Sequence, residues 1–241
     1  MPPSADSPRD GRQTRWDGHK EERRRHIIAA AIDIAQRSEP GTEIHIQEIA
    51  EHAGLSRTVV YRHFADRADL DRAVQATILE GVWALLLPEV RVEGTVPEII
   101  GRIISAYVTW AVDHPALHRL ADHDTSHDHG PLEEGLDRLA EQITELVLVA
   151  LPVTKLENPD EFIALVDPMV YGIVGAAFSA VRRWISRPEQ VLPAEGVAHL
   201  VTESIWFVIQ GHAANFGVEL TRDLRMEDLL ASALATDSLP T

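Results

Sequence analysis

The segment GLSRTVVYRHF, residues 54–64, restricts more strongly than any other what this chain can form. It follows a short stretch, at about residues 45–53, whose apolar residues recur at helical spacing. Gly54 ends that stretch, because glycine readily adopts the turn conformations that other residues avoid. Ser56 is suited to begin the next helix, since its hydroxyl can accept an unpaired amide of the first turn. Two short helices joined by a tight turn predict a helix-turn-helix.

The second of these helices has an apolar side and a polar, cationic side. Val60 and Phe64 stand four residues apart, so they are expected to anchor the helix to its neighbours. Arginine can bind the edge of guanine, threonine can bond several bases, and valine can meet a thymine methyl group. Tyrosine and histidine suit contacts with phosphate. We therefore expect DNA contacts from Ser56, Arg57, Thr58, Val59, Tyr61, Arg62 and His63.

The charge of the chain is unevenly distributed. Residues 1–72 contain 12 Lys and Arg against 13 Asp and Glu, whereas residues 73–241 contain 10 against 25. The first part is thus close to neutral, and the later part has a net charge of -15. An acidic body repels nucleic acid, so contact with DNA is expected to be confined to one end of the molecule. The cations at Lys20 and residues 23–25 oppose the dipole of the helix that they open, and a phosphate partner would account for them.

Residues 41–70 resemble the DNA-binding domain of the TetR (tetracycline repressor) family. The run is GTEIHIQEIAEHAGLSRTVVYRHFADRADL, and the matching positions are Ile49, Ala50, Ala53, Gly54, Leu55, Ser56, Tyr61, Phe64 and Leu70. The chain departs from the family pattern at His45, where threonine is common, and at Val59, which is more often polar. Arg67 stands where the family usually has a lysine that touches phosphate. Adding Arg24, Gln47 and Arg67 to the seven residues above completes the predicted DNA-binding set.

The resemblance implies an all-α protein that regulates transcription, most commonly as a repressor. Such a protein binds a palindromic double-stranded DNA operator as a homodimer and responds to a small-molecule effector. The expected organisation is a disordered tail at residues 1–19, a helix-turn-helix domain at 20–66, and a ligand-binding and dimerisation domain at 67–241. Asp66 is expected to cap a fourth helix. Further helices are expected at about 96–113, 115–122, 132–151, 160–187, 194–217 and 224–235.

The last two long helices are expected to form the dimer interface. Residues 170–187 combine small residues near one-turn spacing with apolar bulk, and residues 194–217 contain a wide apolar stripe. Two such helices from each subunit would form a four-helix bundle across a two-fold axis. Part of each stripe must serve as core within the chain. The predicted interface residues are Val174, Ala177, Val181, Trp184, Trp206, Ile209 and Ala213.

The helices between residues 73 and 170 are expected to enclose the effector pocket. Their mixture of aromatic and aliphatic residues favours an apolar or aromatic small molecule. The predicted ligand-binding residues are Trp83, Leu86, Tyr107, Trp110, Leu117, Leu139, Ile143 and Met169. Each of them is also compatible with plain hydrophobic core.

Residues 113–131, DHPALHRLADHDTSHDHGP, contain five histidines and four aspartates. His114 and His118, like His123 and His127, are four residues apart, which on a helix would place two imidazoles on one face as metal ligands. The alternative is a polar loop that follows a short helix and ends at Gly130. We predict no metal and no cofactor for the protein.

Composition excludes several other classes of function. There is no cysteine, which excludes disulfide scaffolds, thiol catalysis and Cys-ligated zinc. Neither a signal-peptide pattern nor an uninterrupted apolar run of membrane-spanning length is present, so a cytoplasmic protein without membrane contact is expected. The bias to arginine, 20 against 2 lysines, suggests a bacterial genome rich in GC.

Two other functions remain open at this stage. A metal-dependent hydrolase could use the histidine and aspartate cluster, although no recognisable catalytic motif accompanies it. A helical adaptor could retain the helix-turn-helix without binding DNA. No catalytic residues are predicted.

Overall fold

The computed structural model describes residues 10–39, 41–121, 130–150, 158–187 and 189–228. Within these ranges the chain is all-α, with no strand and one isolated bridge between Thr95 and Arg225. It divides into two compact units. The first contains residues 1–78 and 116–130, and the second contains residues 79–115 and 131–241. The all-α class predicted from the sequence is confirmed.

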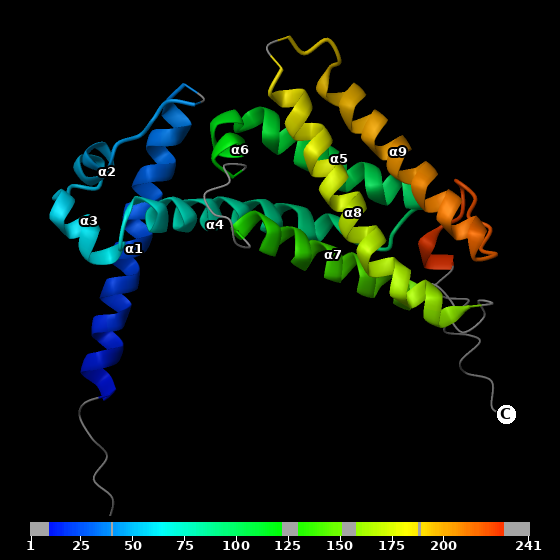
Figure 1. Cartoon of the computed structure of the whole chain (residues 1–241), viewed down its shortest axis with the longest axis horizontal. Coiled ribbons are helices and arrows are strands. Elements are labelled where there is room, and N and C mark those ends of the chain that lie inside the picture. Colours follow the sequence, from blue (N-terminus) through cyan, green and yellow to red (C-terminus); the bar gives the residue numbers. More distant parts are fainter. Residues whose placement is uncertain (1–9, 40, 122–129, 151–157, 188, 229–241) are drawn as a thin grey trace, which may run out of the picture. The chain divides into compact units, whose positions relative to one another are not determined.

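Three helices packed against one another begin the first unit. They are α1 (Asp10–Arg37), α2 (Ile46–His52) and α3 (Arg57–His63), drawn in blue to cyan in Figure 1. Their shared core contains Ile27, Ile49, Ala50, Val60 and Phe64, each at most 2% exposed. The apolar spacing of the sequence produces this core, because each helix buries one stripe.

Helix α1 begins at Asp10, ten residues before the position expected from the sequence. The prediction of a disordered tail over residues 1–19 is therefore wrong for residues 10–19, and residues 1–9 lie outside the described part of the chain. No proline occurs between Asp10 and Arg37, so no residue blocks the helix from extending toward the N-terminus.

Carboxylates cap the short helices. The Glu48 carboxylate accepts the amide of His45, the N-cap residue of α2, at 2.8 Å. Asp66 precedes α4 (Arg67–Leu86), and its Oδ1 accepts the Asp69 amide at 2.8 Å, as expected for a cap. Ser56 is the N-cap residue of α3 by position, but its hydroxyl accepts no amide of that helix. The predicted capping bond of Ser56 is therefore wrong, and this hydroxyl is left exposed.

Helix α6 (Pro115–Ala121) belongs, from residue 116 onward, to the first unit, although it is distant in sequence. Gln75 of α4 is buried, and its Nε2 donates to the Ala121 carbonyl at 2.7 Å. Arg119 lies against Gly41, where Nη1 would be 2.8 Å from an added Cβ. Gly41 has a φ of 95°, so its backbone conformation favours glycine there. The first unit is thus assembled from two separate stretches of chain.

The second unit is built from long helices. They are the end of α4, α5 (Val96–Asp113), α7 (Pro131–Ala150), α8 (Pro159–Ile185) and α9 (Ala194–Asn215), with a 3-10 turn at Leu87–Glu89. Helix α5 packs mainly on α9 and α7 on α8, as Figure 1 shows in green to orange. These helices agree closely with the sequence expectation. Residues 226–228 begin the helix expected at 224–235, whose remaining residues lie outside the described part.

Helix α8 continues through Pro168, which is exposed. It is also the helix among the described residues whose length and composition would suffice to cross a bilayer, with a mean hydropathy of 1.7 over 18 residues. The apolar sequence is interrupted by Asp167 and by residues 182–183. In the second unit α8 packs on α7 and α9 and buries Phe162, Val166 and Val170.

Candidate DNA-binding surface and effector cavity

The turn between α2 and α3 depends on Gly54. Its φ is 64°, in the left-handed region that glycine occupies without a Cβ clash. The Leu55 amide donates to the Ala50 carbonyl at 2.8 Å and closes the turn. Val60 and Phe64 are 0% and 1% exposed and anchor α3 to the core of the first unit. The anchoring role predicted for these two residues is confirmed by their burial.

The outer side of α3 presents a cationic and aromatic surface. Arg57, Thr58, Tyr61 and Arg62 are exposed, and Tyr61 is 41% accessible. The Arg57 guanidinium lies 5.5 Å from the Tyr61 ring centre, and its Nη2 donates to the Tyr61 hydroxyl at 3.3 Å. Arg62 makes no contact with an acidic group in the described residues. Val59 is half-buried rather than fully exposed, so it presents only part of its side chain.

Two arginines predicted to contact DNA are bound within the first unit. Arg24 donates to the His63 carbonyl at 2.7 Å and to Asp69 at 3.3 Å. Arg67 donates from Nε to both Asp71 oxygens at 2.8 Å and from Nη1 to the Ile44 carbonyl. Their charges are therefore used to join α1, α3 and α4 and to fix the segment before α2. The sequence could not reveal the partners of Arg24, which lie on other helices, whereas Asp71 stands four residues after Arg67 and could have been recognised as its partner.

Cations of α1 lie beside the end of α3. Burial, followed by the positive charges of Lys20, Arg23 and Arg24, lowers the pKa of His63. Lys20 and Arg23 are exposed and make no ion pair among the described residues, so both charges remain available at this surface. They are absent from the predicted DNA-binding set. The signal for them was the run of cations at the start of the helix, one turn before Arg24.

Gln47 lies on the exposed side of α2, where its Nε2 donates to Glu51 at 2.6 Å. Two further bonds hold α2 and the turn against α1. His52 Nε2 is 2.6 Å from Asp33 Oδ2, and His26 Nε2 is 3.0 Å from the Ala53 carbonyl oxygen. The position of the helix-turn-helix is therefore fixed by polar bonds around its apolar core.

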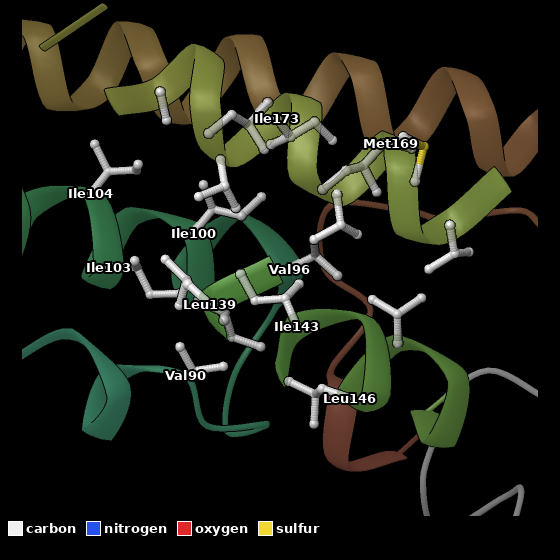
Figure 2. A pocket seen from close by; sticks show the side chains of 18 of the residues that line it. Val90, Val96, Ile100, Ile103, Ile104, Leu139, Ile143, Leu146, Met169 and Ile173 are labelled. Carbon is white, nitrogen blue, oxygen red and sulfur yellow. The ribbon is translucent and has the colours of Figure 1, made fainter. Parts of the chain in front are cut away.

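A cavity of about 230 Å³ lies within the second unit. Its walls come from the end of α4, from α5, α7, α8 and α9, and from residues that follow α9. Figure 2 shows Ile100 and Ile103 of α5, Leu139 and Ile143 of α7, and Met169 of α8 around it. Apolar carbon forms almost all of the wall, so the cavity suits an apolar guest.

Six of the eight predicted ligand-binding residues line this cavity. They are Trp83, Leu86, Tyr107, Leu139, Ile143 and Met169. Tyr107 stacks on Phe178 with ring centres 5.5 Å apart. Trp110 and Leu117 do not line it: Trp110 stacks on His114, and Leu117 is buried in the first unit. Sequence reasoning missed most of the α5 wall, because its isoleucines are indistinguishable from ordinary core.

Most of the seven residues predicted for the dimer interface pack inside the second unit. Val174, Ala177, Ile209 and Ala213 line the cavity, while Val181 and Trp206 are 0% and 1% exposed. Trp184 is half-buried and donates from Nε1 to the Leu192 carbonyl at 2.8 Å. A side chain that is already buried in one subunit cannot bury the same surface against another. The buried members of this set therefore pack within one chain, and their assignment to a dimer interface was wrong.

The histidine cluster is only partly described. His114 ends α5, with Nδ1 3.0 Å from the Trp110 carbonyl oxygen, and His118 is buried in α6. The two therefore do not occupy one continuous helix. Among the described residues no group of three His, Asp or Glu side chains is placed to hold a metal ion. His123, His127 and His129 lie outside the described residues.

Comparison with known proteins agrees with this geometry. A family model described as "Bacterial regulatory proteins, tetR family" matches residues 27–74. An HTH-type transcriptional regulator of Mycobacterium tuberculosis is 27% identical over 207 residues, covering 84% of this chain and 83% of its own. A TetR-family regulator from Streptomyces coelicolor has a similar fold, with a TM-score of 0.59, 22% identity and 89% coverage of both chains. The structure of RolR in complex with resorcinol gives a TM-score of 0.57, with 17% identity and coverage of 93% and 97%.

The helix-turn-helix and the helical second unit define a DNA-binding transcriptional regulator. Residues 27–74 match the DNA-binding domain of the TetR family of transcriptional regulators, as the sequence indicated, and the relatives and similar structures support a regulator of that family. The Mycobacterium tuberculosis relative and the Streptomyces coelicolor protein are both described as transcriptional regulators.

Proposed function

We propose that this protein is a cytoplasmic transcriptional repressor that binds a two-fold symmetric operator as a homodimer and leaves it when a small apolar molecule enters the cavity. The observation on which this rests most is the outer side of α3. Arg57, Thr58, Tyr61 and Arg62 project from a short helix whose opposite side is fully buried. A helix held in this way enters the major groove as a rigid element.

The contacts divide into two kinds. Arg57, Thr58 and Arg62 serve to bind base edges, since guanidinium and hydroxyl groups match them. Tyr61, His63, Gln47 and Ser56 serve to bind phosphate, together with Lys20 and Arg23 of α1. Arg24 and Arg67 position these groups through their bonds inside the first unit. Val59 offers its exposed part to a thymine methyl group.

Selection from a random-sequence DNA library tests the first part of the proposal. The wild-type protein is expected to enrich a palindrome whose half-sites are centred about one helical turn, or a multiple of it, apart. Arg62→Ala should then weaken binding to that DNA by about tenfold or more, since one bidentate base contact contributes about 1–3 kcal/mol. Arg138→Ala, an exposed arginine of α7, should leave it unchanged. Absence of any enriched sequence would refute DNA recognition.

The outward sides of α8 and α9 support a dimer. On α9, Leu200, Phe207 and Val208 are 58%, 61% and 43% exposed, and they follow one another at helical spacing. Tyr171 and Gly172 are exposed on α8. Large apolar side chains on one helical stripe favour burial against a second copy of the chain. These residues replace the buried set that the sequence suggested for the interface.

Sedimentation analysis tests the dimer. Phe207→Asp is expected to yield monomers at micromolar concentration, because it places a charge inside the proposed interface. Val191→Asp is the matched control: Val191 is 92% exposed but lies outside the helices, so the dimer should persist. A monomeric wild-type protein, or a dimeric Phe207→Asp variant, contradicts this interface.

The release mechanism uses α4, which contributes residues to both units. Near its start Asp69 bonds Arg24 of α1, and near its end Trp83 and Leu86 line the cavity. An effector lowers DNA affinity only if it binds better to a form in which the recognition helices are wrongly spaced. RolR, a structural neighbour, was determined with the small molecule resorcinol, which supports effector binding in a protein of this fold.

A further inference from the structure

The apolar cavity adjoins a second, polar pocket in the same unit. This pocket, of about 300 Å³, lies between the start of α8 and the end of α9. It is lined by Asn158, Glu161, Leu165, His212, Asn215 and Phe216. Leu165, His212 and Phe216 line both spaces. The apolar cavity therefore shares these three residues with an open polar pocket, in which Asn158, Glu161 and Asn215 are exposed.

His212 is the polar group at this shared wall. Among the described residues that line the apolar cavity, it is the only His, Lys, Arg, Asp or Glu. Its imidazole has no hydrogen-bond partner within the described residues. The imidazole is half-buried, and its ring nitrogens can donate a hydrogen bond to a polar group of a guest or accept one from it.

The dimensions of the apolar cavity favour a slender guest. Its lining on α8 runs from Phe162 to Phe178, which is about 24 Å at the rise of an α-helix. An apolar cavity of about 150 Å³ binds benzene, so a volume of about 230 Å³ suits a guest of roughly nine non-hydrogen atoms. A long lining around a small volume fits a chain of about eight to ten non-hydrogen atoms better than a fused ring system.

The charges around the polar pocket select the end of that chain. Among the described residues that line the polar pocket, Glu161 is the one ionisable group besides His212, and none is a lysine or an arginine. A carboxylate on the guest would thus meet the Glu161 carboxylate with no cation among these described residues to balance it. Asn158, Asn215 and His212 offer both donors and acceptors to a neutral hydroxyl, amide or ester.

We propose that the effector is an uncharged amphiphile, with an unbranched apolar chain of about eight to ten atoms in the cavity and a hydrogen-bonding end at His212. This inference rests on the proposed function, in which the cavity holds the effector. The inference states the chemical class of the effector and places its polar end beside His212.

Isothermal titration of the full-length protein with a series of 1-alkanols tests the proposal. From 1-hexanol upward, affinity is expected to rise about fourfold per methylene and to stop rising at about 1-octanol to 1-decanol, when the chamber is full. 1-Octanol should bind at least about tenfold more tightly than octanoate at pH 7.5, because of Glu161. Equal or tighter binding of octanoate, or affinity that continues to rise to 1-tetradecanol, would overturn it.

His212→Leu identifies the end at which the polar group sits. It should weaken 1-octanol binding by about three- to tenfold, the contribution of one neutral hydrogen bond, and leave n-octane binding unchanged or stronger. His199→Leu is the matched control, since His199 is exposed on the same helix and lines neither pocket. Loss of 1-octanol and n-octane binding together would indicate a collapsed cavity and contradict a hydrogen-bonding role for His212.

Binding to the selected DNA is measured on the same preparations. If 1-octanol shows none of these preferences while the protein still binds its DNA, the amphiphile proposal fails and the regulatory function stands. If no DNA is bound but the alkanol series behaves as expected, the proposed function fails and the ligand class stands.

Discussion

The guanidinium carbon of Arg24 lies 4.2 Å from the centre of the Phe64 ring. The same group donates to the carbonyl of His63 and to Asp69, so one arginine of α1 binds the end of α3 and the start of α4. Stacking on an aromatic face and hydrogen bonding in plane are both available to a planar guanidinium, and lysine could not reproduce them. A cation that resembles a DNA contact in the sequence thus stabilises the helix-turn-helix from within.

Replacing Arg24 by alanine should loosen the first unit. Loss of a charge-assisted hydrogen bond and the ring contact is expected to lower the opening free energy of α1–α3 by about 2 kcal/mol. Hydrogen exchange of the amides in these helices would then be about thirtyfold faster. Arg25 is an exposed neighbour without a partner among the described residues, so Arg25→Ala should change the opening free energy by no more than about 0.5 kcal/mol. Equal effects of both substitutions would contradict the assigned role.

Gly135→Ala should destabilise the second unit. An added Cβ would lie 2.2 Å from Nε1 of Trp83, so the buried indole would have to move toward the cavity that it lines. Overpacking of this kind costs about 1–3 kcal/mol, which at about 2–4 °C per kcal/mol is expected to lower the melting temperature by about 2–12 °C. Gly81→Ala is the control, since nothing lies within 4 Å of its added Cβ on exposed α4 surface. That variant should be at least as stable as the wild type.

Stability of the first unit should depend on pH through His63. Burial and the nearby cations of α1 lower its pKa, so the folded protein favours the neutral imidazole. As the pH falls below about 6.5, His63 is protonated in the unfolded chain but stays neutral in the folded state, so the free energy of unfolding decreases. Between pH 7.5 and 5.5 the opening free energy of the first unit should therefore fall by up to about 1 kcal/mol more in the wild type than in His63→Gln, as measured by hydrogen exchange at each pH. A difference that does not vary with pH would contradict the lowered pKa.

Lys20→Ala should weaken DNA binding through its phosphate contact alone. The slope of log affinity against log salt concentration is expected to become shallower by about 0.9, while the order of preference among sequences stays the same. Arg138→Ala on α7 should leave the slope unaltered. A changed sequence preference in Lys20→Ala would point instead to base contact.

Much of the fold was predictable because helical spacing and breakers are local properties of a sequence. Gly54, Pro131 and Pro159 mark boundaries that the structure places within about one residue of expectation. The start of α1 was missed, since the polar residues before Lys20 lack an apolar stripe and still form helix. Periodicity identifies an apolar face but does not say what covers it, which explains why Trp206 was assigned to an interface and lies in the core instead.

The candidate sites were predictable to a different degree. The outer residues of α3 follow directly from Val60 and Phe64, because the two anchors fix which side faces outward. The partners of Arg24 were not predictable, since contacts between helices depend on tertiary packing, whereas the pairing of Arg67 with Asp71, four residues later on α4, was visible in the sequence. The polar pocket at His212 was missed for the same reason: Asn158 and Asn215 are far apart in sequence and meet only through folding.

The bond from Gln75 to the Ala121 carbonyl has a practical consequence for work with separate parts of this chain. A fragment that stops at residue 78 would leave the Gln75 amide without its acceptor and would strip α6 from the surface that it covers. Grafting the recognition region onto another regulator therefore requires residues 116–121 to travel with it. An operator-swapping chimera is best joined at two places in the sequence.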